Sequence, residues 1–138
     1  WAEVERAADW VRAGTRQNEA RSRSHIDAAW EHGHAVQVRF VFCPWEQAVV
    51  NILRRAGKET GRIVPLARSA GGHFQAARTV LSLAAANSGN EANFTIRVFD
   101  NTDFKNPVPH EAGWLRDRLH DSVEKLFETG RIVAEGFF

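Results

Sequence analysis

The stretch from residue 35 to residue 65 constrains the fold most, because its pattern changes from strand to helix within a few residues. Apolar and polar side chains alternate over residues 36–42, which is the pattern of a half-buried β-strand. Pro44 ends this pattern, because proline cannot donate a hydrogen bond to a strand ladder. Apolar residues then recur at helical spacing over residues 45–55. The sequence therefore predicts a strand that leads directly into an amphipathic helix.

Three arginines lie within nine residues around the glycine-flanked turn after this helix: Arg54, Arg55 and Arg62. The transition state of phosphoryl transfer spreads negative charge over the oxygens of the transferred group, and a planar guanidinium group can contact two of them at once. The three arginines are therefore candidate catalytic residues. A structural explanation stays open, because arginines at the C-terminal end of a helix also complement the helix dipole and remain solvated.

The chain has 138 residues, enough for one domain with a buried core. Its 18 basic and 17 acidic residues give a net charge of +1, which does not indicate a general nucleic-acid or membrane binder. No apolar run is long enough to span a bilayer and no signal peptide is visible, so we expect a cytoplasmic protein. The single cysteine, Cys43, excludes an internal disulfide and is expected to be an inert, buried thiol.

The chain lacks methionine and the known motifs of phosphate-binding loops. It contains no methionine and begins with Trp1, so we expect a piece of a longer protein whose N-terminal part is missing. It also contains neither GxxxxGK(S/T) nor GxGxxG, the patterns of loops that cradle phosphates. A kinase reaction would therefore need a phosphate-binding loop from residues upstream of Trp1.

The patterns on either side of the central stretch predict further elements. In chain order these are a strand or more helix at residues 9–13, with the strand favoured, a helix from an N-cap at Asn18 to Gly33, a loop or single turn at 66–72 broken by Gly71-Gly72, and a helix at 74–87. They continue with a strand at 94–100, a proline-bounded loop at 103–109, a helix from Trp114 to Gly130, and a further strand or packed tail at 132–138. Strands that alternate with helices predict an α/β domain with a mostly parallel sheet and flanking helices. Three clear strands are few for such a sheet, and further N-terminal strands would complete it.

The order of these features resembles the zeta-toxin family of P-loop kinases. The matching features are, in order, Ala13-Gly14-Thr15-Arg16, the helix to Trp30, Gly33, the strand over 36–42, Arg54 or Arg55, Gly61-Arg62-Ile63-Val64-Pro65, the helix from Phe74, and Val98-Phe99-Asp100-Asn101. The match covers residues 8–102. It implies a P-loop kinase-like fold in which residues 14–103 form the central region with a lid near 54–72, while residues 104–138 form a C-terminal helix and tail of the same domain.

The zeta-toxin family phosphorylates UDP-N-acetylglucosamine with ATP and Mg²⁺. The resemblance implies that Arg62 and one of Arg54 and Arg55 contact the γ-phosphate of ATP, and that Thr15 and Arg16 lie beside the substrate. It also implies a nucleotide and a small molecule as substrates and an antitoxin protein as a partner. The chain differs from the family in lacking the Walker A loop, the acidic general base, and the usual glycine between Thr15 and Arg16. We expect the loop and the base to lie upstream of Trp1.

Two other functions stay open on the sequence alone. The absence of a phosphate-binding loop also fits a non-catalytic α/β module that binds or regulates a partner. A degenerate kinase domain fused to a DNA-processing protein is a further possibility, to which the near-neutral charge gives little support.

The histidines do not predict a metal site. The closest pair, His32 and His34, has no cysteine or carboxylate nearby at ligand spacing. His73 precedes a predicted helix and is expected to be a surface residue rather than a substrate contact.

Acidic residues on the last predicted helix are expected to form a solvated, ion-paired face, because basic residues surround them: Asp117, Asp121 and Glu124. Three tryptophans fall on the apolar faces of predicted helices and are expected in the core: Trp30, Trp45 and Trp114.

Overall fold

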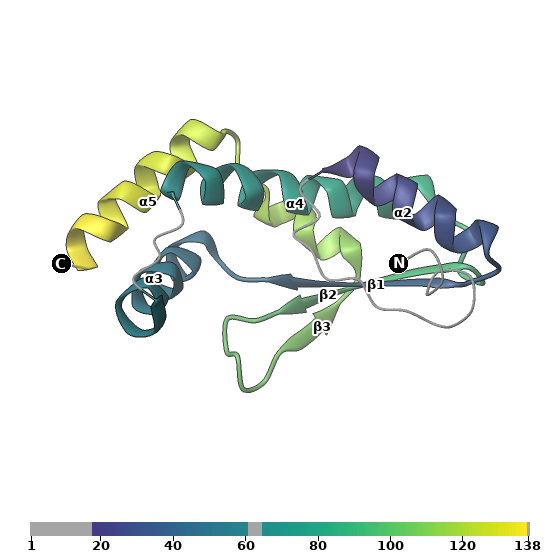
Figure 1. Ribbon diagram of the computed structural model, residues 1–138, viewed down its shortest axis with the longest axis horizontal. Helices are drawn as coiled ribbons and strands as arrows, with labels where there is room; N and C mark the ends of the chain where they lie inside the picture. The colour runs from purple at the N-terminus through teal and green to yellow at the C-terminus, as the bar shows by residue number, and fades with distance from the viewer. Residues whose placement is uncertain (1–17, 61–64, 138) are drawn as a thin grey trace.

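The structure is a computed structural model that describes residues 18–60 and 65–137. Its elements, in chain order, are α2 (Glu19–Glu31), β1 (Val36–Phe42), α3 (Trp45–Arg55), a π-helical turn η1 (Ala56–Thr60), α4 (Leu66–Ala86), β2 (Phe94–Asp100), β3 (Val108–His110), a 3₁₀ helix η2 (Ala112–Arg118) and α5 (Val123–Phe137) (Figure 1). The helices and strands predicted around α2, β1, α3 and β2 are confirmed. The strand predicted at residues 9–13 lies outside the described residues.

The three strands form a mixed sheet in the order β1-β2-β3. β1 and β2 run parallel, with Phe42 opposite Asp100 at their carboxyl ends, whereas β2 and β3 run antiparallel. Among the described residues the sheet is therefore mixed, with one parallel and one antiparallel pair, whereas the sequence predicted a mostly parallel sheet. β3 overlaps the end of the segment predicted as a loop (103–109), and Pro109 is tolerated there because β3 is a short edge strand. The general α/β architecture is confirmed.

Helices α2, α4 and η2 lie on one face of the sheet, and no helix among the described residues covers the other face (Figure 1). The strand patterns match this arrangement. Phe42, Phe94 and Val98 point to the covered face and are buried, while Arg39 and Arg97 on the opposite face are exposed. The alternation of buried and exposed side chains along each strand thus shows which face of the sheet the helices cover.

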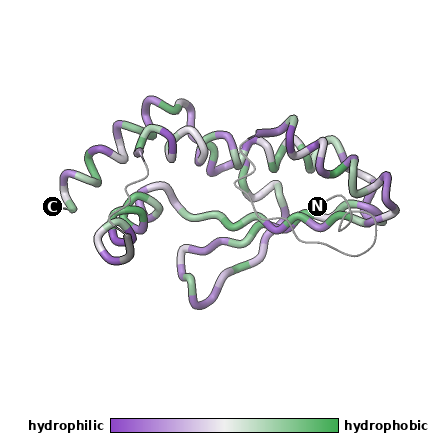
Figure 2. The backbone as a smooth tube through the Cα atoms, viewed as in Figure 1, coloured by the Kyte–Doolittle hydropathy of each residue, from purple (hydrophilic) through white to green (hydrophobic). Residues whose placement is uncertain are grey.

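The buried side chains form two separate regions, here called the body and the arm. The body comprises α2, the sheet, η2 and residues 75–86 of α4. Its clusters are built on Phe42, Ala77, Val80, Val98, Ala112 and Leu115 and on Ile26, Leu83 and Phe94. The arm comprises α3, α5 and residues 66–74 of α4. Its cluster is built on Trp45, Val49, Ala70 and Leu126, and hydrophobic positions recur between hydrophilic ones along α3 and α5 (Figure 2).

α4 begins at Leu66, so the predicted loop at residues 66–72 is wrong. Gly71 and Gly72 were expected to break the chain, but they lie inside this helix. Each glycine in a helix interior costs up to about 1 kcal/mol relative to alanine. Burial of Ala70 and packing of Leu66 in the arm offset that cost.

The last predicted helix is also wrong, because it is two elements separated by residues 119–122. Leu115 of η2 packs in the body, whereas Leu126 of α5 packs in the arm, so one straight helix could not serve both regions. Gly130 does not end α5, which continues through residues 132–137. This glycine instead allows a close approach, since a Cβ atom there would lie 3.0 Å from the Trp45 ring.

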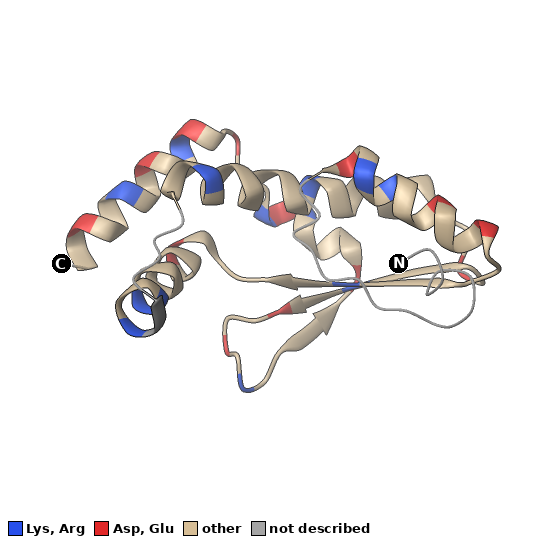
Figure 3. Ribbon diagram, in the orientation of Figure 1, with Lys and Arg blue, Asp and Glu red and all other residues tan. Residues whose placement is uncertain are grey.

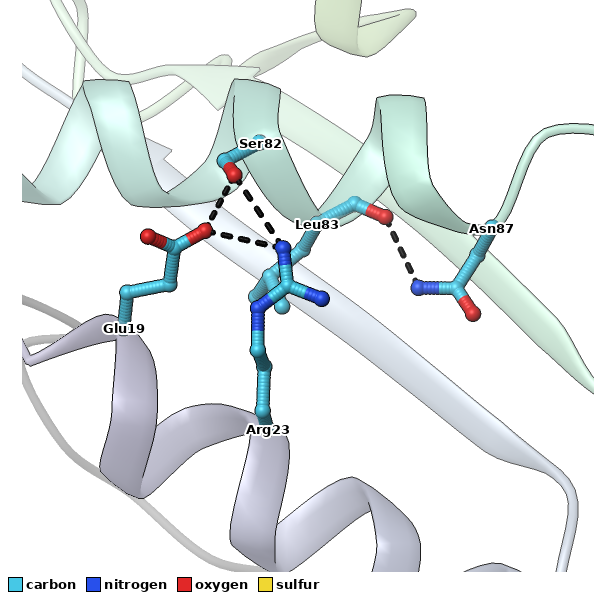
Figure 4. Close-up of polar contacts among 5 residues, drawn as sticks. All are labelled: Glu19, Arg23, Ser82, Leu83 and Asn87. Atoms are coloured by element: carbon cyan, nitrogen blue, oxygen red, sulfur yellow. Dashed lines mark hydrogen bonds and ion pairs between the residues drawn. The ribbon is translucent and has the colours of Figure 1, made fainter.

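α2 begins as predicted, with the Asn18 side chain accepting a hydrogen bond from the Arg21 amide at 2.9 Å. Polar contacts attach α2 to α4: Glu19 accepts a hydrogen bond from the Ser82 hydroxyl, and Arg23 lies 3.0 Å from Glu19 and 3.3 Å from Ser82 (Figure 4). These contacts lower the pKa of Glu19, with the Ser82 hydroxyl as the largest cause. Among the described residues, no helix is long and apolar enough to cross a membrane.

Candidate functional site

The carboxyl ends of β1 and β2 meet at one edge of the sheet, next to the start of α3. Ligands of open α/β sheets commonly bind at this edge. The pairing continues one residue beyond the strands, because the Asn101 amide donates to the Phe42 carbonyl at 2.8 Å. Cys43 and Asp100 therefore lie together at the edge. We take this edge, with the side chains around it, as the candidate site.

Asp100 is held in a fixed orientation by a turn that follows β2. Its Oδ1 accepts hydrogen bonds from the Thr102 hydroxyl at 2.6 Å and from the Thr102 amide at 3.0 Å. The hydroxyl bond is the largest cause of a lowered pKa of Asp100, and the nearby His110 and Arg118 lower it further. The edge therefore presents an ionised carboxylate at neutral pH.

A stack of side chains from β3 and η2 lies beside Asp100. The His110 and Trp114 rings are parallel, with centroids 4.3 Å apart, and the Arg118 guanidinium lies 3.5 Å from the Trp114 ring. Arg118 also donates to the Trp114 carbonyl at 2.8 Å, and Phe42 meets Trp114 edge-on at 5.4 Å. These contacts fix an imidazole and a guanidinium near the carboxylate.

His73 lies at the boundary between body and arm. Its ring centroid is 5.2 Å from that of Trp45, 5.8 Å from Phe42 and 5.7 Å from His120. The pKa of His73 is lowered from 6.5 to about 4, chiefly by burial and also by the charge of His120, while Glu46 opposes both. His73 is therefore a neutral imidazole at physiological pH, and its buried Nε2 has no hydrogen-bond partner among the described residues.

The position of His73 corrects the expectation of a surface residue at a helix start. α4 begins upstream of it, so His73 is half-buried in the interior of the helix. The signal that could have placed it is its spacing, three residues after Ala70 and four before Ala77, on the buried stripe of α4.

Cys43 is half-buried, and burial raises the pKa of its thiol, with the charge of Asp100 as a second cause. A thiol with a raised pKa is protonated and weakly nucleophilic. The expected inert role of Cys43 agrees with this environment.

The sequence-predicted arginines are described only in part. Arg54 and Arg55 are the last two residues of α3, as expected, and both are exposed. Figure 3 shows basic positions in blue on α3. Neither makes an ion pair or a side-chain hydrogen bond within the described part of the chain. Arg62, Thr15 and Arg16 lie outside the described residues, so their distances to Arg54 and Arg55 are not defined.

The remaining polar candidates do not form a site. Asp117 belongs to η2, Glu124 belongs to α5 and Asp121 lies between them, so they do not share one helical face. Asp121 lies 3.7 Å from Lys125, which agrees with the expected ion pairing.

The fit of the expected cofactors can be judged from the donor groups. Within residues 18–60 and 65–137, no three histidines, cysteines or carboxylates are placed to hold a metal ion. The sequence contains no phosphate-cradling loop either. The described residues therefore provide no cluster of three such metal ligands, and the sequence provides no loop of the known phosphate-cradling patterns. Comparisons of the chain with protein-family models, curated proteins and solved structures found no match.

Proposed function

We propose that this chain is part of a zeta-toxin-like kinase, which transfers the γ-phosphoryl group of ATP to a hydroxyl of a small substrate such as a UDP-amino sugar. The observation that supports this most is the pair Arg54 and Arg55. Two exposed guanidinium groups, unpaired among the described residues, end the helix that follows β1 of the parallel pair. Arg62 follows within the segment that resembles the family's lid.

The chemistry of these arginines suits the reaction. A guanidinium group stays charged at any physiological pH and stabilises the negative charge that develops on the transferred group. Successive helical residues point about 100° apart, so only one of Arg54 and Arg55 can face a given phosphate. The proposal therefore assigns stabilisation of the transition state to Arg62 and one of these two residues. ATP and Mg²⁺ are bound by residues outside the described part.

The same proposal assigns binding of the hydroxyl substrate to Thr15 and Arg16. It includes an antitoxin protein as partner and a cytoplasmic location. These assignments rest on the resemblance of residues 8–102 to the family.

The proposal is tested by alanine substitution in the full protein with ATP, Mg²⁺ and UDP-N-acetylglucosamine. Arg62→Ala should lower kcat about 10³-fold or more, the magnitude typical of an arginine finger. One of Arg54→Ala and Arg55→Ala should show a similar loss and the other a small one. Arg39→Ala, on the exposed face of β1, is the matched control and should leave kcat unchanged. An unchanged kcat in Arg62→Ala, or no phosphoryl transfer by the wild type, would reject the proposal.

A second function, a non-catalytic interaction module, is favoured by one observation. The sheet face opposite α2 and α4 is uncovered by described helices, and Val41 on it is 59% exposed. Calorimetric titration of the full protein with Mg²⁺-ATP distinguishes the kinase function from the interaction module. Binding supports the kinase, whereas absence of binding supports the module.

A further inference from the structure

Asp100 and His110 lie on the same face of the sheet, next to its carboxyl edge. In the ladder between β2 and β3, Asp100 is opposite Val108 and Val98 is opposite His110, so Asp100 and His110 are diagonal neighbours. Side chains in this relation lie about 7–8 Å apart, a distance that long side chains can span. The register therefore brings a carboxylate and an imidazole together, and the proposed kinase arginines involve neither of them.

Arg118 joins these two side chains from η2, which packs against β2. Its guanidinium lies 3.5 Å from the Trp114 ring, and the Trp114 ring is stacked on the His110 ring. Arg118 and His110 are both half-buried, and both lie close enough to Asp100 for their charges to lower its pKa. Three polar side chains from β2, β3 and η2 therefore lie together beside the edge.

Asp100 and Arg118 carry opposite charges, but they are absent from the ion pairs of the described residues. Each is held by other groups instead. Oδ1 of Asp100 accepts from the Thr102 hydroxyl and amide, and Arg118 donates to the Trp114 carbonyl. Two opposite charges that are fixed by their neighbours, rather than by each other, are pre-organised for a ligand that contacts both.

Most of the hydrogen-bonding capacity of these side chains is unused within residues 18–60 and 65–137. Oδ2 of Asp100 and both ring nitrogens of His110 make no hydrogen bond there, and Arg118 uses one of its N–H groups. Asp100 therefore offers an acceptor, Arg118 offers donors, and the neutral His110 ring offers one of each.

These free groups select the chemistry of the ligand. A carboxylate accepts hydrogen bonds from hydroxyl or ammonium groups, but the charge of Arg118 repels an ammonium group beside Asp100. Neutral hydroxyls are therefore the better partners. A guanidinium and an imidazolium bind phosphate oxygens through charge-assisted hydrogen bonds. Hydroxyls and a phosphate occur together, a few bonds apart, in a phosphorylated sugar.

We propose that Asp100, His110 and Arg118 form a binding site for a phosphorylated sugar, in which Asp100 accepts hydrogen bonds from ring hydroxyls while Arg118 and His110 bind the phosphate. The ribose phosphate of a nucleotide and the hexose phosphate of a nucleotide sugar both present these groups. The site requires neither Arg62 nor the kinase reaction, and binding is measured without them.

The first test titrates the full protein, without ATP or Mg²⁺, with ribose 5-phosphate, N-acetylglucosamine 1-phosphate and inorganic phosphate in turn. Heteronuclear NMR should show a saturable shift of the Trp114 indole N–H. One or both sugar phosphates should bind about tenfold more tightly than inorganic phosphate, because their hydroxyls add hydrogen bonds to the charged Asp100. The tighter probe identifies the source of the sugar. Equal affinities for all three probes, or no saturable shift with either sugar phosphate, would overturn the proposal.

Asp100→Asn tests the hydroxyl contact separately from the phosphate contact. It should weaken binding of the tighter sugar phosphate about tenfold without weakening that of inorganic phosphate, because it removes only a negative charge. The matched control is Asp103→Asn. Asp103 is an exposed aspartate that also accepts from a backbone amide, that of Lys105, but lies outside the site. Equal weakening by both variants would contradict the assignment of Asp100.

Arg118→Gln tests the phosphate contact and should weaken all three probes about tenfold or more. Arg116→Gln, at an exposed position of η2, is its control and should leave the affinities unchanged. Because Arg118 packs on Trp114, thermal melting of each variant shows whether it folds. His110→Gln removes the second phosphate ligand and serves if Arg118→Gln does not fold. Unchanged affinities in a folded variant of either residue would reject the phosphate contact.

The binding site and the kinase proposal can fail separately. A wild type that binds a sugar phosphate but transfers no phosphoryl group would leave the site standing and reject the kinase proposal alone. An active kinase whose Asp100→Asn variant binds sugar phosphates as tightly as the wild type would reject the site alone.

Discussion

The body and the arm differ in how their cores are built. The body draws its buried side chains from five elements, α2, β1, α4, β2 and η2, so no single residue dominates it. The arm draws on three helical segments around Trp45, which is 1% exposed and whose indole N–H donates to the Leu126 carbonyl at 2.7 Å. A core spread over many elements tolerates loss of one member better than a core centred on one ring.

The largest expected effect comes from Trp45→Ala. Removing a buried tryptophan costs about 3–5 kcal/mol, and the buried Leu126 carbonyl would also lose its donor. Hydrogen exchange should show lost protection in α3 and α5 while β1 and β2 stay protected.

Trp45→Phe is the matched variant for this prediction. It keeps a ring but removes the N–H group, so it should cost less than the alanine variant. Equal loss of protection in arm and body after Trp45→Ala would show that the two regions form one cooperative unit.

The next prediction compares the effects on stability of replacing two glycines of α5. In Gly130→Ala the new Cβ would lie 3.0 Å from Trp45 and 3.3 Å from the Leu66 side chain, so overpacking should destabilise the arm by about 1–3 kcal/mol. Gly136→Ala meets no atom within 4 Å and should stabilise by up to about 1 kcal/mol. Urea unfolding of both variants measures the difference. A stabilising Gly130→Ala would mean that Trp45 can move away without cost.

The last effect concerns the boundary and its dependence on pH. Burial and His120 lower the pKa of His73 from 6.5 to about 4. The unfolded chain binds a proton near pH 6.5, but the folded chain resists it until about pH 4. The free energy of unfolding should therefore be highest above pH 6.5 and fall as the pH decreases towards 4, by about 2 kcal/mol after allowance for partial exposure of the ring.

His73→Phe removes this proton site and keeps a ring between Phe42 and Trp45. Its unfolding free energy should fall less than that of the wild type over the same pH range. His32→Gln, at an exposed position after α2, is the control and should follow the wild-type curve. Parallel curves for wild type and His73→Phe would exclude His73 as the source of the pH dependence.

The sequence correctly predicted those helices and strands in which the periodicity of apolar residues shows which side is buried. β1 and β2 alternate because one sheet face is covered, and α2 and α3 carry local start or stop residues, namely Asn18, Gly33 and Pro44. The same local reasoning placed Arg54 and Arg55 at the end of a helix and Asp100 at the end of a strand. The roles of those arginines in phosphoryl transfer stay predictions, together with the roles of Arg62, Thr15 and Arg16.

Two of the incorrect predictions lie where two regions compete for one segment. From the neighbouring residues alone, Gly71-Gly72 was expected to interrupt the helix. Packing of Leu66 and Ala70 against Trp45 keeps α4 helical there. Residues 112–137 read locally as one helix and a tail, yet they divide because Leu115 and Leu126 belong to different cores. The partners in these contacts are distant along the chain, so no local window contains the information.

The sequence by itself determined the alternating strands, the helix that follows β1, the start of α2 and the exposed basic end of α3, because each depends on residues within a few positions. Only the tertiary structure decided that β3 joins the sheet, that α4 spans two cores, and that His73 lies neutral and half-buried between Phe42 and Trp45. The physical reason is burial: the environment of a side chain depends on which distant elements cover it, and that is settled only when the chain has folded.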